Sequence, residues 1–255
     1  MVLNMGLRDG WIHVFSKKEP VPHERRPTVA AVMVAAGSST RMGMPKQLIP
    51  LYGMPVIARS LMAFEMANLV DEIIVVVREA DMLQVYDICK SYEISKITKI
   101  IKGGETRQQS VSHGIYAARD CTEYFAIHDG ARPLIRPETI DAVIAAAFQV
   151  RAASAAVRVK DTIKMSDENG FITGTPDRRF LWNVQTPQVF ERTLYLEALR
   201  RATAEGVEYT DDCQLVERLG VPVQLCEADY ANIKITTPED VAFAEGILRE
   251  RGERF

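Results

Sequence analysis

A near-continuous apolar run without polar alternation occupies positions 29–34, and further strands are expected at 72–77, 97–101 and 124–127. This pattern is typical of parallel strands that are covered on both faces. Helices are expected between and after these strands, beginning at Pro55, near 80–90, at 137–150 and after Glu191. The repeated strand–helix order predicts an α/β fold with a doubly wound, mostly parallel, Rossmann-like sheet.

The rhythm breaks in the second half of the chain. A strand at 153–159 is followed by 160–164 and 169–173, which together predict a hairpin that turns at Asp167–Gly170. An isolated two-stranded ribbon is only marginally stable, so we expect this hairpin, at about 158–178, to project as an arm that contacts a second subunit. A further strand is expected at 221–226.

The chain is predicted to form one domain over residues 28–255, preceded by an extension at 1–27. The second half of the extension is rich in charge and proline. It is expected to be a disordered segment, an accessory segment or the product of an early start codon, and it is given no catalytic role.

Composition narrows the class of protein. The formal net charge is −3, whereas a general nucleic-acid binder would show a basic excess. No apolar run approaches the ~20 residues that span a bilayer. The cysteines have no C-x-x-C spacing and are interpreted as thiols in a reducing cytosol, so we expect a cytoplasmic protein. From the charge balance and the lengths of the apolar runs, we expect neither nucleic-acid nor membrane partners.

The most informative stretch follows the first apolar run. Small and hydroxylic residues occupy 35–40 and two cations follow, Arg41 and Lys46. Such a loop allows a ligand to approach closely, and its N–H groups can hold phosphate oxygens. The spacing matches neither the P-loop nor the G-x-G-x-x-G pattern. An ordinary turn needs no pair of spaced cations, so the stretch predicts a polyphosphate site.

Two further segments follow strands. Residues 103–110, GGETRQQS, form either a capped helix start or, with Gly104 and Ser110, part of a ligand site at the carboxyl edge of the sheet. Asp129 in HDGARP is expected to bind Mg²⁺ with phosphate oxygens, although an ion pair with Arg132 is an alternative. His128 is expected to be structural. Lys234 is expected in an apolar strand, where it needs a phosphate or a carboxylate partner.

Taken in order, AAGSSTRMGMPKQ, GGETRQQSV, HDGARP, VKDTIK, TPQVF, TDD and NIKITTPED closely resemble the 2-C-methyl-D-erythritol 4-phosphate cytidylyltransferase family, a branch of the sugar nucleotidyltransferases. The resemblance runs from about Val29 to Leu248. It implies transfer of CMP from CTP to methylerythritol phosphate in the non-mevalonate isoprenoid pathway, with Mg²⁺, in a homodimer whose arm crosses between subunits.

The resemblance also implies roles for individual residues. The catalytic residues would be Arg41 and Lys46 on the triphosphate and Asp129 on the metal. The nucleotide would be held by Ala35, Ala36, Gly37, Gly104, Glu105 and Ser110. The acceptor would be bound by Ala131, Arg132, Thr186, Thr210 and Lys234, with Thr162 and Arg178 reaching the neighbouring subunit's site.

Two other functions are compatible with these motifs. A sister enzyme that uses ribitol 5-phosphate shares the CTP motifs, although VKDTIK and the segment around Asp177, Arg178 and Trp182 look more like the methylerythritol enzyme. A catalytically silent nucleotide-binding protein could have the same fold. It would be expected to lack Arg41, Lys46 or Asp129, and all three are present.

Overall fold

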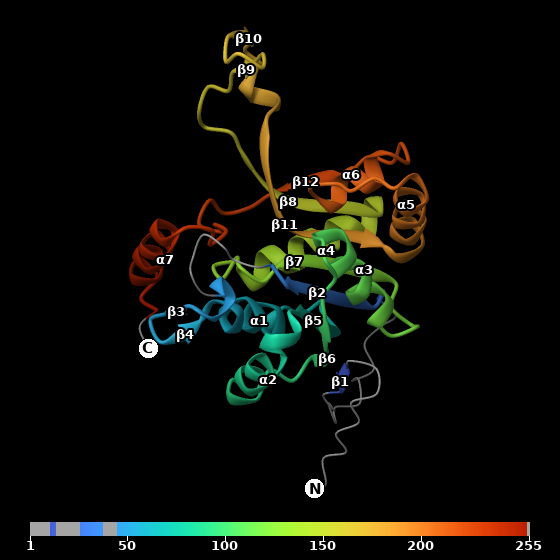
Figure 1. Ribbon diagram of the computed structural model, residues 1–255, viewed down its shortest axis with the longest axis vertical. Helices are drawn as coiled ribbons and strands as arrows, with labels where there is room; N and C mark the ends of the chain where they lie inside the picture. The colour runs from blue at the N-terminus through green and yellow to red at the C-terminus, as the bar shows by residue number, and fades with distance from the viewer. Residues whose placement is uncertain (1–10, 14–25, 38–44, 254–255) are drawn as a thin grey trace, which may run out of the picture.

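An eight-stranded mixed sheet runs through the part of the chain that the computed structural model describes, residues 11–13, 26–37 and 45–253 (Figure 1). Its order is β1-β6-β5-β2-β7-β11-β8-β12. The strands are β1 Trp11–His13, β2 Val29–Ala35, β5 Glu72–Val77, β6 Ile97–Lys102, β7 Tyr124–Asp129, β8 Ala152–Arg158, β11 Trp182–Glu191 and β12 Gln224–Glu227. Only β1 and β11 run against the others in this sheet. The prediction of a mostly parallel sheet is confirmed.

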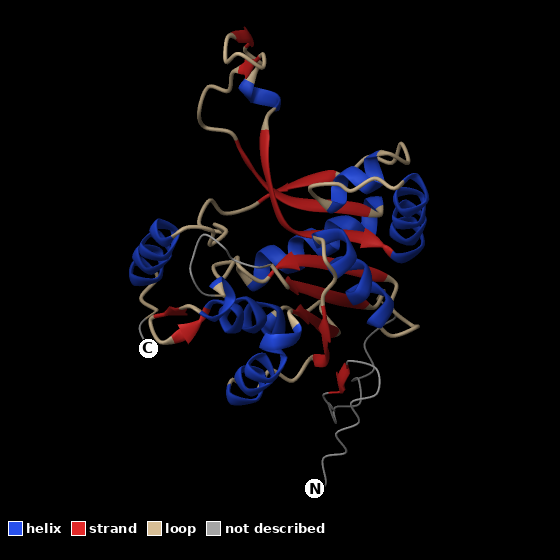
Figure 2. Ribbon diagram, viewed as in Figure 1, coloured by secondary structure: helices blue, strands red, loops and turns tan. Residues whose placement is uncertain are grey.

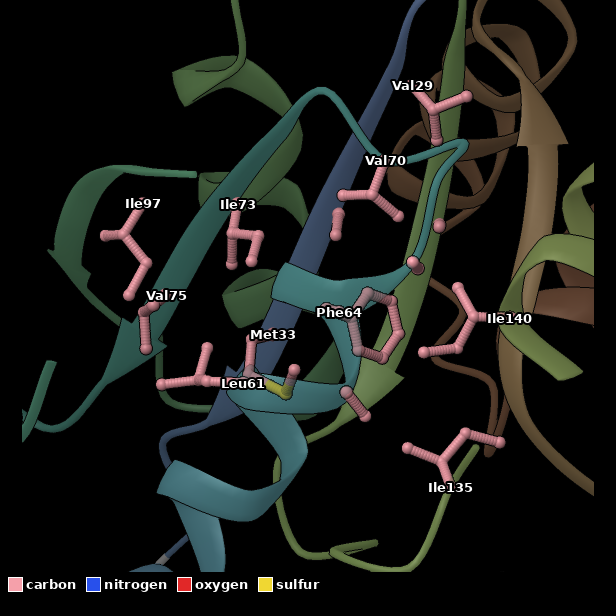
Figure 3. Close-up of a cluster of buried hydrophobic side chains, with 14 of the residues drawn as sticks. Val29, Met33, Leu61, Phe64, Val70, Ile73, Val75, Ile97, Ile135 and Ile140 are labelled. Carbon is pink, nitrogen blue, oxygen red and sulfur yellow. The ribbon is translucent and has the colours of Figure 1, made fainter. Parts of the chain in front are cut away.

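Helices cover both faces of the sheet, as a doubly wound fold requires. They are α1 Val56–Met66, α2 Met82–Ser91, α3 Arg107–Ala117, α4 Pro137–Val150, α5 Arg192–Glu205, α6 Asp212–Glu217 and α7 Pro238–Glu250. On one face α1, α2 and α4 share a buried cluster with alternate residues of β2, in which Leu61 and Phe64 lie with Met33 (Figure 3). On the other face α3, α5 and α6 contribute to a second buried cluster that contains Ala30 and Val32. Because both faces are covered, β2 is apolar throughout.

Strand β11 was not predicted. It lies between β7 and β8 and is antiparallel to both. Gln185, Thr186 and Gln188 make this stretch polar, yet all three side chains are buried because they hydrogen-bond to neighbouring elements. The register to β8 shifts between Val184 and Gln188. Local sequence therefore resembles a loop, whereas tertiary hydrogen bonds make it a central strand.

The expected strand around Lys234 is wrong. Residues 228–236 have no regular structure, and the expected strand at 221–226 is β12, Gln224–Glu227. The apolar neighbours of Lys234 mimic a strand, but Ile233 and Ile235 pack instead against α7 and the short β3–β4 hairpin, Pro50–Leu51 and Met54–Pro55. The predicted helix start at Thr237 is confirmed by a capping box with Asp240.

The arm is present, and it connects β8 to β11 (Figure 2). Only β9, Met165–Ser166, and β10, Ile172–Gly174, pair within it. The expected strand at 160–164 is irregular, so that part of the prediction is wrong. The predicted turn is confirmed because the Asn169 and Phe171 N–H groups donate to the Asp167 carboxylate, and Gly170 has φ +84°, which favours glycine.

Candidate active site

A cavity of about 330 Å³ lies at the carboxyl ends of β2, β6 and β7. It is where an open α/β sheet is expected to bind a ligand. The structure brings ten of the predicted site residues to its wall: Ala35, Ala36, Gly37, Lys46, Gly104, Glu105, Ser110, Asp129, Ala131 and Lys234. Arg41 lies outside the described residues. Segments that are distant in sequence thus form one site.

The segment between β6 and α3 is shaped by short contacts. A Cβ on Gly103 would lie 2.4 Å from the Ala36 Cβ atom, so glycine lets this segment approach the end of β2 closely. The Ser110 hydroxyl accepts the Gly104 N–H at 3.1 Å and donates to the Thr106 carbonyl at 2.9 Å. Thr106 also caps α3. The expected helix cap is therefore confirmed, and Ser110 holds the segment in shape.

Gln47 fixes the backbone beside Lys46. Its buried amide donates to the Ala35 carbonyl at 2.9 Å and to the Asp81 carboxylate at 3.3 Å. Arg78 holds Asp81 through two hydrogen bonds, of 2.7 and 2.9 Å. Gln47 was not identified as a site residue from the sequence. Its position directly after Lys46, a candidate phosphate-binding lysine, was the available signal.

Asp129 ends β7 and is surrounded by cations. Its carboxylate lies 2.8 Å from Lys234 Nζ, 3.6 Å from Arg107 Nε and 3.7 Å from Arg132 Nε. Burial alone would raise the pKa of Asp129, but Lys234, Arg107 and Arg132 outweigh it and hold this pKa well below the usual range. The carboxylate is therefore ionised throughout the physiological pH range.

His128 and Thr186 support Asp129 from beneath. The Thr186 hydroxyl accepts the Asp129 N–H at 3.1 Å and lies 2.9 Å from His128 Nδ1, while His128 Nε2 lies 3.4 Å from the Arg132 carbonyl. These contacts fit a neutral ring that is protonated at Nε2. Burial lowers the pKa of His128 to about 3. The predicted structural role fits this geometry, and Thr186 contributes as a support below the cavity.

Arg132 also lies behind the cavity wall. It donates to the Asn232 carbonyl at 2.8 Å, and Asn232 in turn donates to the Thr186 carbonyl at 3.0 Å. Burial lowers the pKa of Arg132, with the Asp129 carboxylate opposing this shift. The expected ion pair with Asp129 is present, and Arg132 joins Asp129 to the segment that carries Lys234.

Arg107 is a cavity residue that sequence reasoning missed. It is the first residue of α3 and lies 2.7 Å from the Asp212 carboxylate, which is 1% exposed. Asp212 also accepts the Tyr195 hydroxyl at 2.7 Å. Burial disfavours charge on Arg107, but Asp212 and Asp129 raise its pKa above the usual value. The paired TDD acids and an arginine directly after the cap were the signals in the sequence.

Three predicted residues lie away from the cavity of their own chain. Thr162 and Arg178 are on the arm, where Arg178 donates to the Lys160 carbonyl at 3.0 Å. Thr210 is exposed just before α6. These three residues therefore do not contribute to the cavity wall of their own chain.

A metal would depend chiefly on Asp129. Within the described residues no group of three or more His, Cys, Asp or Glu side chains could hold a metal ion. Mg²⁺ commonly uses one or two carboxylates and completes its octahedron with phosphate oxygens and water. An ionised carboxylate at the edge of a cavity that also contains Lys46 and Lys234 fits that coordination.

Comparisons with known proteins identify the family of this chain. The model of the 2-C-methyl-D-erythritol 4-phosphate cytidylyltransferase family matches residues 29–250. A relative of that name from Caldanaerobacter subterraneus subsp. tengcongensis is 50% identical over 227 residues, which cover 87% of this chain and 99% of the relative. One from Geobacillus kaustophilus is 46% identical, over 87% of this chain and 97% of the relative.

Solved structures give the same result. The 4-diphosphocytidyl-2C-methyl-D-erythritol synthase of Anaerococcus prevotii superposes with a TM-score of 0.80 at 32% identity, covering 88% of this chain and 96% of that one. The 2-C-methyl-D-erythritol 4-phosphate cytidylyltransferase of Thermus thermophilus gives 0.70 at 30% identity, over 88% and 100%. In the described part of the chain, no helix has the length and apolar character needed to cross a membrane.

Proposed function

The chain belongs to the 2-C-methyl-D-erythritol 4-phosphate cytidylyltransferase family, and we propose that it transfers CMP from CTP to 2-C-methyl-D-erythritol 4-phosphate with release of pyrophosphate. The observation that carries the proposal is the cavity at the switch point of the sheet, where a small-residue strand end and Lys46 face Asp129 and Lys234. Positive charge gathered in one cavity suits two anionic phosphate ligands.

The proposed reaction is a single in-line displacement. An oxygen of the acceptor phosphate attacks the α-phosphorus of CTP, a new phosphorus–oxygen bond forms, and the bond to the β-phosphate breaks. Lys46, with Arg41, would stabilise charge on the transferring and leaving phosphates, and Lys234 would hold the acceptor phosphate. The acceptor phosphate is already ionised at neutral pH, so no general base is required, in keeping with a neutral His128.

The nucleotide would lie along Ala35, Ala36 and Gly37 and against the segment of Gly104, Glu105 and Ser110. These groups share a wall of the cavity, and Arg107 adds a cation between this wall and Asp129. When bound, Mg²⁺ would neutralise phosphate charge and orient the triphosphate. Asp129 is the side chain that we propose holds it, because its carboxylate is ionised and faces the same cavity.

The arm supports a proposed homodimer. Exposed apolar side chains gather on it: Ile163, Met165, Phe171, Ile172 and Phe180. Exposed apolar patches of this kind mark contact surfaces. In such a dimer Thr162 and Arg178 would reach the partner's cavity. Sedimentation of the wild type and of a Phe171→Ser/Phe180→Ser variant tests the proposal: a dimer is expected for the first and monomer for the second.

A cytoplasmic location is also proposed. All four cysteines, Cys89, Cys121, Cys213 and Cys226, are free thiols, and free thiols are typical of a reducing compartment.

The decisive experiment measures pyrophosphate release from CTP and Mg²⁺, with methylerythritol 4-phosphate and ribitol 5-phosphate supplied separately. Release with the first acceptor alone is expected. Release with the second alone would keep the nucleotide site and overturn the acceptor. Release with neither, from protein that is folded by circular dichroism, would favour a silent nucleotide-binding protein.

A further inference from the structure

The segment that carries Lys234 has no regular structure of its own. It spans residues 228–237, between the end of β12 and the start of α7. Its backbone is tied at two points, where the Ala228 N–H donates to the Ala156 carbonyl of β8 and the Ile235 N–H donates to the Ala131 carbonyl in the turn after β7, each at 2.8 Å. Between these points, side chains must hold the segment in place.

Asp229 provides the local turn of this segment. Its carboxylate accepts the Ala231 N–H at 2.9 Å, and its carbonyl accepts the Asn232 N–H at 3.0 Å. Its carbonyl also lies 3.3 Å from the Gln185 amide of β11. An aspartate that bonds to backbone two residues on fixes a tight turn. The path of the chain toward Lys234 is therefore set at Asp229 together with the buried Asn232, whose amide donates to the Gln185 side chain at 2.8 Å and to the Thr186 carbonyl at 3.0 Å.

Two arginines approach the other oxygen of this carboxylate. Arg251, just beyond the end of α7, lies 3.3 Å away, and Arg136 lies 3.6 Å away. The Asp229 side chain is 40% exposed, that of Arg251 is 15% exposed and that of Arg136 is 53% exposed. Exposed ion pairs contribute little, so Arg251 is the stronger partner of Asp229.

Arg251 reaches a second segment at the same time. One of its terminal nitrogens donates to the Leu134 carbonyl at 3.1 Å, and the other contacts Asp229. Leu134 lies in the turn that follows Asp129 and Arg132. A single planar guanidinium thus joins the two segments whose side chains, Lys234 and Asp129, meet at 2.8 Å in the cavity.

We infer that Asp229 and Arg251 form a clamp that positions Lys234 for the acceptor phosphate. Both are positioning residues, because neither lines the cavity. The inference rests on the proposed function for its kinetic consequence. A lysine side chain is long and flexible, so its ammonium is placed only as well as its backbone is held. The clamp affects the acceptor side, since the nucleotide wall is built from β2 and the segment before α3.

The kinetic test compares Arg251→Ala and Asp229→Asn with the wild type. We expect kcat/KM for the acceptor to fall about tenfold, within the ~100-fold that a 1 Å misplacement can cost, and KM for CTP to stay within about twofold. Arg251→Lys should recover only part of the loss, because an ammonium cannot span both acceptors in the fixed fork of arginine. Arg249→Ala, which changes an exposed arginine in the last turn of α7, is the matched control.

Hydrogen exchange tests the clamp without any chemistry. In Arg251→Ala the Asn232 and Ile235 amides should exchange about tenfold faster, whereas β2 amides should not change. Unchanged exchange at these two amides would overturn the clamp, and so would equal losses for CTP and acceptor. If the wild type shows no activity with methylerythritol 4-phosphate, the proposed function fails, and exchange still decides whether the clamp exists.

Discussion

The buried Tyr195–Asp212 hydrogen bond allows a quantitative prediction. Tyr195 is fully buried, and its hydroxyl donates to a carboxylate that also pairs with Arg107. Burial, together with Asp212, raises the pKa of Tyr195 well above its usual value, so the hydroxyl remains a donor. A hydrogen bond to a charged group contributes about 1.5–3 kcal/mol. Tyr195→Phe should therefore destabilise the protein by an amount in that range.

The measurement is a double-mutant cycle of Tyr195→Phe and Asp212→Ala, each of which removes the hydrogen bond, followed by thermal unfolding. Because the two side chains share a bond, we expect a coupling free energy of at least about 1.5 kcal/mol. For a domain of this size, that corresponds to about 3–6 °C in Tm. Tyr116→Phe on α3, where the tyrosine is exposed, is the control and should leave Tm unchanged. A coupling below about 0.5 kcal/mol, the scatter of independent sites, would refute this reasoning.

Three other predictions test separate features. Gly114→Ala in α3 should lower the free energy of unfolding by about 1–3 kcal/mol, because its Cβ would lie 2.3 Å from a methyl group of Val32 in β2. Gly246→Ala in α7 should stabilise the protein, because a Cβ there meets nothing within 4 Å. Equal free energies of unfolding for the two variants in chemical denaturation would contradict this. His128 takes up a proton below pH 6.5 in the unfolded protein but only near pH 3 in the folded protein. Its contribution to stability is therefore complete above pH 6.5 and is lost as the pH falls toward 3. By NMR, one of the four histidines should not titrate between pH 5 and 8, and four normal midpoints would disprove this prediction. Lys46→Ala should lower kcat at least about tenfold, which is ~1.4 kcal/mol. Lys90→Ala, which changes an exposed lysine, is the control and should leave kcat unchanged. A smaller loss for Lys46→Ala would show that Lys46 does not stabilise the transition state.

The sequence predicted the strands β2, β5, β6 and β7 because β2, β5 and β7 are largely apolar and β6 keeps Ile97, Ile100 and Ile101, so that local composition already indicates their burial. It did not predict β11, because Thr186 and Gln188 are buried only through partners in β7 and α6 that are distant in sequence. The same reason explains the error at Lys234. An apolar neighbourhood predicts burial, but this irregular segment is held by contacts of Asp229 with Arg251 and of Asn232 with Gln185, which no local pattern connects.

The candidate site shows the same division. Residues that follow strands, such as Gly104 and Asp129, were predicted because parallel strands end at a common edge. Arg107 was missed because its importance comes from Asp212, more than 100 positions further along the chain. Thr162 and Arg178 lie on the arm, away from the cavity of their own chain, so their proposed contact with the acceptor depends on a second subunit.

The position of β11 also constrains how the chain folds during synthesis. Strands β6, β5, β2 and β7 are neighbours that can pair once residue 129 has been made. The next strand to be made, β8, cannot complete the sheet, because β11 lies between it and β7. Until the arm and then residue 191 have left the ribosome, β7 presents an unpaired, apolar edge of the kind that promotes aggregation. The length of the arm therefore sets how long the nascent sheet stays open at β7, beside the strand end that carries Asp129.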